Sequence, residues 1–327
     1  MSEVSVVAHP NIALSKYWGK RDGAGNFPAV PSLSVTLAGL ETRTSVRFDS
    51  RLDDDRVTLD GAAADAGVRE RAVVLLDRVR RASGETRRAE VRSRNDFPTA
   101  SGLASSASGF AALALAASRA AGLAWDAARV SDVARRSSAS AARSVFGGFA
   151  ELAAGPVAPD EALLLGAQPV APPDHLPMAV LVCVTTEARK AVGSTDGMRR
   201  TMAESPYARA WLEEAPRLHA RLRAALLARD FPEVGALAEA SSLAMHACAI
   251  AAGVTYWNGA TLAALAAVRA IRADGIGAFA SIDAGPHVKV LTLAADAARV
   301  ATVMREVAGV LRLIEARPGE GATEVAA

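Results

Sequence analysis

The amino-acid sequence predicts a mixed fold of helices and strands (α+β) arranged in two domains. Its 327 residues suit one large or two medium domains with an ample core. Strand-like segments alternate along the chain with Ala-rich segments of helical character. A Pro-rich segment, Val157 to Pro177, is the best domain boundary. We therefore expect an N-terminal domain over residues 1–175, a C-terminal domain over 176–316 and a flexible tail over 317–327, where little can be buried.

The N-terminal half combines predicted strands with three predicted helices. The first helix is amphipathic, the second is apolar and stops at Gly122, and Asp126 is a plausible N-cap of the third. Polar side chains at Ser32, Ser34 and Thr36 alternate along one strand and should share a face. The strands are expected at Val4–Ala8, Pro28–Leu37, Thr42–Phe48, Val57–Leu59 and Ala89–Arg94, and the helices at Val68–Ala82, Phe110–Ala121 and Asp126–Arg136.

The C-terminal half begins with a strongly apolar strand, Met178–Thr186, which should exit into a polar loop, Glu187–Arg200. Three helices follow, and two strands then flank the segment Ser281–His287. A further helix and strand complete the domain. The expected helices are Ser205–Arg229, Asp230–Gly253, Asn258–Gly275 and Ala294–Val307, and the last strand is Gly309–Ile314.

Composition narrows the function classes. A hydrophobic fraction of 51% with 22% charged residues is typical of a soluble globular protein, and a formal charge of +2 is too small to indicate nucleic-acid binding. The basic run Arg69–Arg94 is interrupted by acidic residues and is interpreted as a solvated face. Cys183 and Cys248 lie in apolar runs, which suits core positions in a reducing, cytoplasmic compartment. We expect neither a signal peptide nor a membrane span, because charges interrupt the apolar runs.

The segment Pro98–Phe110 is small and polar, and it leads into the second predicted helix. Such a junction presents free backbone N–H groups and the positive end of a helix dipole, which together favour phosphate. Hydroxyl groups here could also bind oxygen atoms or a magnesium ion. A serine-capped core helix explains the same residues, so the local pattern leaves both interpretations open.

The second stretch of interest is His9–Asp22, because it contains two of the few lysines of the chain. The chain has only four lysines against 33 arginines, and two of the four are Lys16 and Lys20, beside Tyr17 and Trp18. A compact ammonium differs from the planar fork of arginine, so a phosphate-binding role would explain why lysine is kept. The alternative is a surface loop with a chance pair.

Two further segments contain charged residues that could bind a substrate or take part in a reaction. Arg143 follows a run of serines that includes Ser138 and Ser140, and Ser/Arg clusters bind oxyanions. Asp283 ends an apolar strand before Ala-Gly-Pro, where a carboxylate could position or deprotonate a hydroxyl. Each has a plainer explanation, a helix end for the first and a local turn hydrogen bond for the second.

Several common motifs are missing from the sequence. The five histidines have no metal-binding spacing, and neither a Gly-x-Gly-x-x-Gly nor a Walker-type phosphate loop occurs. A Rossmann cofactor and a Walker nucleotide site are therefore unsupported.

Taken together, the motifs resemble those of one family. The Gly/Ser segment is similar to the phosphate loop of the GHMP kinase superfamily, and the wider set looks like its mevalonate diphosphate decarboxylase branch. The motifs occur in the family's order and cover nearly the whole chain. They are Asn11-Ile12-Ala13, Lys16-Tyr17-Trp18-Gly19-Lys20-Arg21-Asp22, Asn95-x-Phe97-Pro98-Thr99-Ala100-x-Gly102-Leu103-Ala104-Ser105-Ser106-Ala107, Arg143-Ser144-x-Phe146-Gly147-Gly148, Gly193-Ser194-Thr195-x-Gly197-Met198, Met245-His246-Ala247 and Asp283-Ala284-Gly285-Pro286.

The resemblance implies an ATP-dependent carboxy-lyase of the mevalonate pathway of isoprenoid biosynthesis. It would convert (R)-5-diphosphomevalonate to isopentenyl diphosphate by phosphorylating the 3-hydroxyl and then releasing phosphate and CO2. The implied fold is the two-domain GHMP arrangement with the active site in a cleft between the domains, and a homodimer is implied as well. A small phosphorylated molecule is the expected partner, with no nucleic acid and no membrane.

The resemblance also implies roles for individual residues. Asp283 would orient or deprotonate the 3-hydroxyl, Lys16 would support the transferring phosphoryl group, and Arg143 would hold the substrate carboxylate. ATP and Mg²⁺ are the implied cofactors, with Ser106 as a metal ligand. The implied substrate-binding residues are Asn11, Tyr17, Lys20, Ser138, Ser140, Arg189 and Lys190, and the ATP-binding residues are Asn95, Gly102, Leu103, Ala104, Ser105, Ser106 and Ser108.

Three departures from the family pattern leave substrate choice open. Ser137-Ser138-Ala139-Ser140 stands where the family usually has Gly-Ser-Gly-Ser, Val30-Pro31 replaces Asn-Ser, and His287 replaces an Asn. The lost glycines would add bulk or restrict the backbone at the anionic end of the substrate. The alternatives are a 5-phosphomevalonate decarboxylase, a mevalonate 3-kinase-type relative and, least favoured, a noncatalytic ligand-binding relative.

Overall fold

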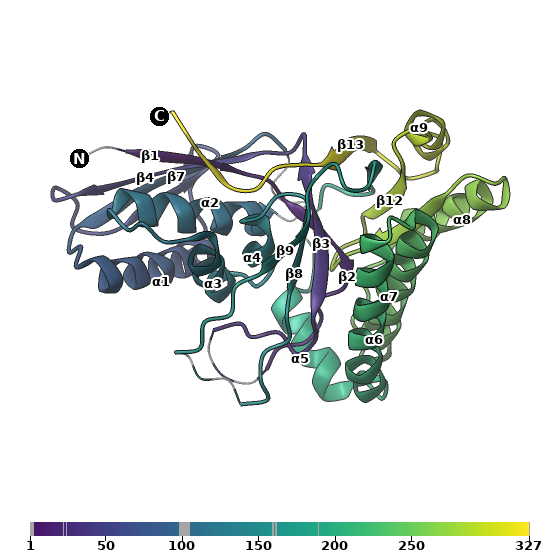
Figure 1. Cartoon of the computed structure of the whole chain (residues 1–327), viewed down its shortest axis with the longest axis horizontal. Coiled ribbons are helices and arrows are strands. Elements are labelled where there is room, and N and C mark those ends of the chain that lie inside the picture. The colour runs from purple at the N-terminus through teal and green to yellow at the C-terminus, as the bar shows by residue number, and fades with distance from the viewer. Residues whose placement is uncertain are drawn as a thin grey trace.

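The computed structural model describes residues 3–21, 23, 25–97, 105–158, 160, 162–188 and 190–326. Helices and strands alternate along the chain, and the fold is mixed, as the sequence predicts (Figure 1). The strands are β1 (Val4–Ala8), β2 (Asn11–Ser15), β3 (Ser32–Ala38), β4 (Thr42–Asp49), β5 (Arg56–Leu59), β6 (Ala62–Ala63), β7 (Arg88–Asn95), β8 (Phe149–Leu152), β9 (Gln168–Ala171), β10 (Met178–Val184), β11 (Ala278–Ile282), β12 (Val288–Leu293), β13 (Arg312–Pro318) and β14 (Thr323–Val325). The helices are α1 (Ala66–Ser83), α2 (Ser105–Ala120), α3 (Ala127–Ser137), α4 (Ala141–Ser144), α5 (Ser194–Glu204), α6 (Ala208–Leu227), α7 (Phe231–Ala251), α8 (Gly259–Ala273) and α9 (Ala297–Arg305).

Helix starts agree well with the capping signals in the sequence. The side chain of Asp126 accepts a hydrogen bond from the backbone of α3, and Asp230 does the same for α7. Asn258 forms a reciprocal capping box with Thr261 at the start of α8. These caps satisfy backbone N–H groups that the first turn of a helix leaves without partners.

The first sheet has the strand order β14-β1-β4-β7-β5-β6. Helices α1 to α4 lie together on one side of it in Figure 1, and α2 contacts both β1 and β4. Alternate side chains of β4 are buried, so one face of this sheet forms a core with the Ala-rich helices.

The second sheet joins strands from both halves of the chain, in the order β11-β12-β10-β13-β3-β8-β9, with β2 pairing to β3. Helices α6 and α7 stand against it on the opposite side from the first sheet (Figure 1). Because β3 and β8 come before the Pro-rich segment and β10 to β13 come after it, this sheet spans the expected boundary. The division at 175/176 stays a prediction.

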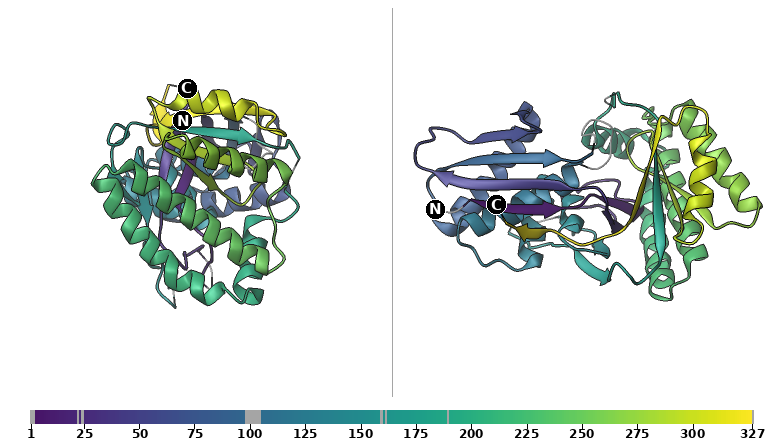
Figure 2. Two further views of the ribbon diagram at one scale, coloured as in Figure 1. Left: turned by 90° about the vertical axis from the view of Figure 1, so that its right-hand side faces the viewer. Right: turned by 90° about the horizontal axis from the view of Figure 1, so that it is seen from above.

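The C-terminal segment is ordered, so the expected flexible tail is wrong. β13 continues to Pro318, and β14 pairs antiparallel with β1 through residues 323–325. The chain crosses from the second sheet to the first in this segment, and the two termini lie near each other (Figures 1 and 2). Two close backbone approaches favour glycine here: an added Cβ would lie 2.5 Å from the backbone of Ala38 at Gly319 and 2.5 Å from the backbone of Val145 at Gly321. Gly and Ala thus serve close backbone packing that composition cannot reveal.

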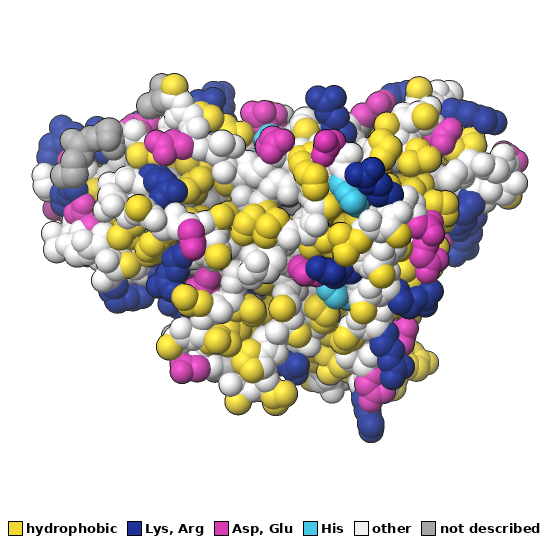
Figure 3. All heavy atoms as spheres, viewed as in Figure 1, with side chains coloured by type: hydrophobic (Ala, Val, Ile, Leu, Met, Phe, Trp, Pro, Cys, Tyr) yellow, Lys and Arg dark blue, Asp and Glu magenta, His cyan; other side chains and the backbone are white. Residues whose placement is uncertain are grey.

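Two other expectations need correction. The segment Glu187–Arg200 is not a loop throughout, because α5 begins at Ser194 and buries Met198. The basic run is not wholly solvated either: Arg80 is buried and bonds the carboxylate of Asp55. Elsewhere on the face shown in Figure 3, acidic and basic side chains are interspersed.

Helix α7 is the one described helix that is long and apolar enough to cross a membrane by length and composition alone, contrary to the expectation that charges exclude such a segment. More than half of its apolar window, 56%, is buried within the protein. It packs against α6, β2 and β11, so a role as a core helix accounts for its composition.

Candidate active site

The most distinctive polar cluster is built around Asp283, directly after β11. Its two carboxylate oxygens face two ammonium groups: Lys16 Nζ lies 2.6 Å from Oδ1, and Lys289 Nζ lies 3.0 Å from Oδ2. Both lysines are buried, whereas Asp283 keeps 27% of its side chain exposed. Burial alone would raise the pKa of Asp283, but the charges and hydrogen bonds of the two lysines outweigh it and hold the pKa well below its usual range. Asp283 is therefore a fixed anion that reaches the surface.

Lys16 is positioned by the end of β2, which pairs antiparallel with β3 in the second sheet. The register of the β2–β3 pairing shifts between Ala13 and Ser15, and the backbone N–H of Lys16 donates to Ser241 on α7. Its ammonium also donates to Ser281, at 2.8 Å. Burial lowers the pKa of Lys16, while Asp283 opposes that shift. The stretch that contains Lys16 is thus a buried strand followed directly by a buried lysine, and the surface-loop alternative is wrong for it.

Arg143 is held by the serines that alternate on β3. Its Nε donates to Ser34 at 3.0 Å and its Nη1 to Ser32 at 2.7 Å. Burial lowers the pKa of Arg143 to about 10, so the guanidinium stays charged at neutral pH. The bonds that the described residues make to Arg143 leave Nη2 for an oxyanion.

Two buried polar atoms near Arg143 lack partners among the described residues. Asn11 donates to the carbonyl of Ser140 and to Ser144, but its Oδ1 has no partner, and neither has the hydroxyl of Tyr17. Burial raises the pKa of Tyr17, which keeps the phenol protonated. An unpaired buried polar atom is costly, so these two atoms point to a ligand that pairs with them.

Ser138 and Ser140 lie at the turn between α3 and α4, with their hydroxyls 3.1 Å apart. Both are partly exposed, whereas the intervening Ala139 and the preceding Ser137 are buried. Ser137 donates to the backbone of Arg71, and Ala139 packs in a small apolar cluster. The two residues that replace family glycines therefore direct their extra atoms into the protein rather than toward the anion-binding side.

The remaining predicted substrate contacts are less tightly grouped. Lys20 bonds Asn26 and Thr195, which ties the N-terminal loop to the start of α5. Lys190 bonds Ser194 and the carbonyl of Ala284, so it lies next to the Asp283 turn. Arg189 lies outside the described residues. Lys16 and Lys20 do not share a partner, so the structure gives them separate positions.

The phosphate-loop residues Gly102, Leu103 and Ala104 also lie outside the described residues. Ser105 and Ser106 are the first residues of α2, a helix of 16 residues, so they lie at its positive end. Ser106 is exposed, and Asn95 is partly exposed at the end of the neighbouring strand β7. Ser108 is fully buried and its hydroxyl bonds Thr42 inside the domain, and its role as an ATP contact stays a prediction.

The donors at this helix start fit Mg-ATP. Within the described part of the chain, no group of three or more His, Cys, Asp or Glu side chains could hold a metal ion alone. Magnesium prefers oxygen ligands and is usually bound by one or two protein groups together with substrate phosphates. The exposed hydroxyl of Ser106 suits that arrangement, and the helix N-terminus suits the phosphates.

Two charged residues near the predicted site belong to none of the motifs named above. Lys289 contacts Asp283 directly, and the only sequence signal for it is the scarcity of lysine. Arg71 lies over the ring of Phe110 and is close enough to Lys20 to lower its pKa, together with burial. It belongs to the run interpreted as solvated, and helical periodicity alone does not separate it from its exposed neighbours.

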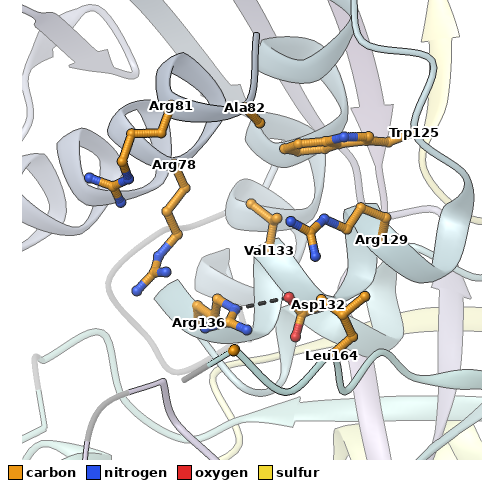
Figure 4. A pocket seen from close by; sticks show the side chains of 10 residues that line it. Arg78, Arg81, Ala82, Trp125, Arg129, Asp132, Val133, Arg136 and Leu164 are labelled. Atoms are coloured by element: carbon orange, nitrogen blue, oxygen red, sulfur yellow. Dashed lines mark hydrogen bonds and ion pairs between the residues drawn. The ribbon is translucent and has the colours of Figure 1, made fainter. Parts of the chain in front are cut away.

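A cavity of about 310 Å³ lies elsewhere, between α1 and α3 (Figure 4). Its charged lining is largely Arg78, Arg81, Arg129 and Arg136, with Asp132 paired to the last of these. None of the predicted site residues that the structure describes lines it. The expected interdomain cleft at Asp283 stays a prediction.

Family models match the chain in two consecutive segments. Residues 8–162 match the diphosphomevalonate decarboxylase-like N-terminal domain, and residues 180–318 match the mevalonate 5-diphosphate decarboxylase C-terminal domain. The diphosphomevalonate decarboxylase of Candida albicans is 32% identical, over 99% of this chain and 98% of that protein. The human enzyme of the same name is 36% identical, over 90% of this chain and 77% of that protein.

Solved structures agree with this assignment. The mevalonate diphosphate decarboxylase of Staphylococcus aureus superposes with a TM-score of 0.92 at 33% identity, covering 99% of this chain and 98% of that one. The enzyme from Enterococcus faecalis gives 0.89 at 36% identity, covering 99% of both chains. A further structure that holds MVAPP, AMPPCP and magnesium gives 0.91 at 36% identity, covering 99% of both chains. With its two domain matches and its shared fold, this chain belongs to the mevalonate diphosphate decarboxylase family, within the GHMP kinase superfamily.

Proposed function

We propose that this protein catalyses the ATP-dependent decarboxylation of (R)-5-diphosphomevalonate to isopentenyl diphosphate. The observation that carries the proposal is the convergence of Lys16, Asp283 and Arg143, which come from three distant parts of the chain. One carboxylate is fixed as an anion, one ammonium bonds it, and one guanidinium is held ready for an oxyanion. Phosphoryl transfer followed by loss of CO2 requires this set of charges.

In the first step, the 3-hydroxyl oxygen of the substrate forms a bond to the γ-phosphorus of ATP, the bond from that phosphorus to the bridging oxygen breaks, and ADP leaves with the electron pair. The hydroxyl proton passes to an oxygen of the transferred phosphoryl group. Asp283 accepts a hydrogen bond from that hydroxyl and aligns its oxygen. A carboxylate whose pKa is held low is a weak base, so orientation is its main contribution. Lys16, which bonds Asp283, supplies positive charge beside the reacting oxygen.

In the second step, the C–O bond to the new phosphate breaks and the phosphate keeps the electron pair. The bond between the carboxyl carbon and its neighbour then supplies the electrons of the alkene as CO2 leaves. Arg143 binds the substrate carboxylate and holds it in line, while Asn11, Tyr17, Ser138 and Ser140 supply polar atoms for the anionic end. Magnesium would neutralise charge on the ATP phosphates at the start of α2.

We propose in addition a cytoplasmic homodimer. The resemblance to the family supports the dimer. Two buried, free cysteines, Cys183 and Cys248, support a reducing compartment. Size-exclusion chromatography with light scattering tests the dimer, and a mass of one chain would contradict it.

The decisive assay compares mevalonate, its 5-phosphate and its 5-diphosphate as substrates with ATP, scoring ADP and CO2 separately. We expect ADP and CO2 in equal amounts with the 5-diphosphate. Turnover of the 5-phosphate alone would overturn the substrate assignment. ADP without CO2 would identify a kinase that stops at the 3-phospho product.

A further inference from the structure

Lys289 is a buried lysine that the reaction described above does not use. It lies on β12 with 1% of its side chain exposed, opposite Ser281 on β11 and Val182 on β10. A buried ammonium is costly unless it is paired, and apolar residues would normally fill such a central strand position. The arrangement therefore needs a reason beyond packing.

The geometry supplies one, because each oxygen of Asp283 has its own ammonium partner. Lys16 Nζ bonds Oδ1 at 2.6 Å, and Lys289 Nζ bonds Oδ2 at 3.0 Å. Within the described part of the chain, the other contact of the Lys289 ammonium is longer, 3.4 Å to the carbonyl of His287. Rotating the carboxylate would break both short bonds at once. The two lysines together therefore fix the plane of the carboxylate, which neither could do alone.

The charges around Asp283 come from several elements and are mostly positive. The ionisable groups that interact with it are Lys16 after β2, Lys289 on β12, Lys190 before α5, Arg143 on α4 and His246 on α7. Burial lowers the pKa of His246 to about 4, so it is neutral at neutral pH and adds no charge. Among the described residues, only Lys16 and Lys289 form ion pairs with the carboxylate.

We propose that Lys289 is a positioning residue of the decarboxylase: it acts through Asp283, by holding Oδ2 so that the carboxylate presents a fixed orientation to the substrate hydroxyl. This rests on the function proposed above. It assigns Lys289 no contact with substrate or ATP. It also explains why an Arg-rich chain keeps lysine here, since a planar guanidinium does not match a single-point contact in this space.

The test compares Lys289→Met and Lys289→Arg with the wild type, using the 5-diphosphate and ATP. Misplacing a reacting group by about 1 Å can cost about 100-fold, so we expect Lys289→Met to lower kcat about 10- to 100-fold with little change in the KM for either substrate. An opposite charge within a few ångströms lowers a carboxyl pKa by about 1–3 units, so its loss should move the acidic limb of the kcat profile to higher pH by about one unit. Lys289→Arg keeps the charge and should leave the acidic limb near that of the wild type.

Thr292 provides a matched control on the same strand. It is also fully buried, and its hydroxyl donates to the carbonyl of Gly277, away from Asp283. We expect Thr292→Val to lower stability while leaving both kcat and the acidic limb unchanged. A Lys289→Met enzyme with wild-type kcat and an unshifted limb would overturn the proposal, as would the same limb shift in Thr292→Val.

A double-mutant cycle keeps the test decisive if Lys289→Met alone folds poorly. Asp283→Asn leaves two buried ammonium groups without a carboxylate, so the double variant should unfold at higher urea than Asp283→Asn alone. In that background Lys289→Met should cause no further loss of residual CO2 release. A further loss as large as in the wild-type background would show that Lys289 does not act through Asp283. If instead the wild type itself fails to decarboxylate the 5-diphosphate, the proposed function fails. The urea comparison then still tests whether Lys289 and Asp283 form a stabilising ion pair.

Discussion

Replacing Asp283 by Asn tests the centre of the site. The change removes one negative charge and leaves the shape of the side chain nearly unaltered. Lys16 and Lys289 then face each other with no carboxylate between them. Breaking a buried ion pair typically costs about 3–5 kcal/mol. Because Asp283 is 27% exposed, we expect the lower end of that range, about 3 kcal/mol of unfolding free energy.

Asp283→Asn should also lower the rate of CO2 release. Misplacing a reacting group by about 1 Å can cost about 100-fold, which corresponds to about 2.7 kcal/mol of activation free energy at 1.36 kcal/mol per tenfold. We therefore expect kcat for CO2 release to fall by at least 100-fold. ATP should still bind, since its proposed contacts lie at the start of α2 rather than at Asp283.

Three measurements separate these effects. Trapped CO2 gives the rate, calorimetric titration gives ATP affinity, and urea unfolding gives stability. Asp55→Asn is the matched control, because Asp55 is a buried carboxylate paired with Arg80 in the first sheet's core. That variant should lose stability yet keep its kcat per folded molecule. CO2 release within threefold of the wild type by Asp283→Asn would refute the role assigned to this carboxylate.

Three further predictions follow from burial and packing. Burial lowers the pKa of His246 to about 4, whereas the unfolded chain takes up that proton near pH 6.5. The unfolded state thus binds protons first as the pH falls, so stability that is fully present above pH 6.5 is lost toward pH 4, about 2 kcal/mol of it by pH 5. In urea unfolding, His246→Gln should lose less stability than the wild type over this pH range. An identical pH dependence of the two proteins would contradict the assignment. Arg143→Lys replaces a planar fork, which bonds Ser34 and Ser32 through two different nitrogens, by a single ammonium that cannot span the same positions. We therefore expect kcat/KM for CO2 release to fall at least about tenfold, and unchanged kinetics would remove Arg143 from the site. An added Cβ at Gly235 would lie 2.1 Å from the ring of Phe279, so Gly235→Ala should cost about 1–3 kcal/mol in urea unfolding, whereas wild-type stability would mean that the ring moves aside freely.

Much of the fold could be predicted from local patterns. Apolar alternation located most strands, and capping residues such as Asp126 and Asn258 marked helix starts, because both signals depend on neighbours within a few residues. The prediction failed where distant chain segments determine the conformation. The C-terminal tail is polar and Gly-rich, yet β14 is ordered because β1 offers it an unpaired edge.

The motifs by themselves determined the family, and they predicted which groups take part in the reaction. Lys16, Arg143 and Asp283 are recognisable in order along the chain, and the structure places all three in one region. Other residue roles needed the structure. The structure buries Ser108, whose hydroxyl bonds Thr42, and it also buries Ser137 and Ala139.

Only the tertiary structure decided how the charges are paired. Lys16 and Asp283 are 267 positions apart in the sequence, and Lys289 reaches the same carboxylate from the neighbouring strand. Sequence periodicity reports which face of an element a side chain occupies, but it carries no information on the register between strands. The register of β11 with β12 places the Lys289 ammonium at one oxygen of the carboxylate, and the packing of β2 against α7 brings the Lys16 ammonium to the other. These two contacts are the physical reason why Asp283 is a fixed anion rather than an ordinary turn residue.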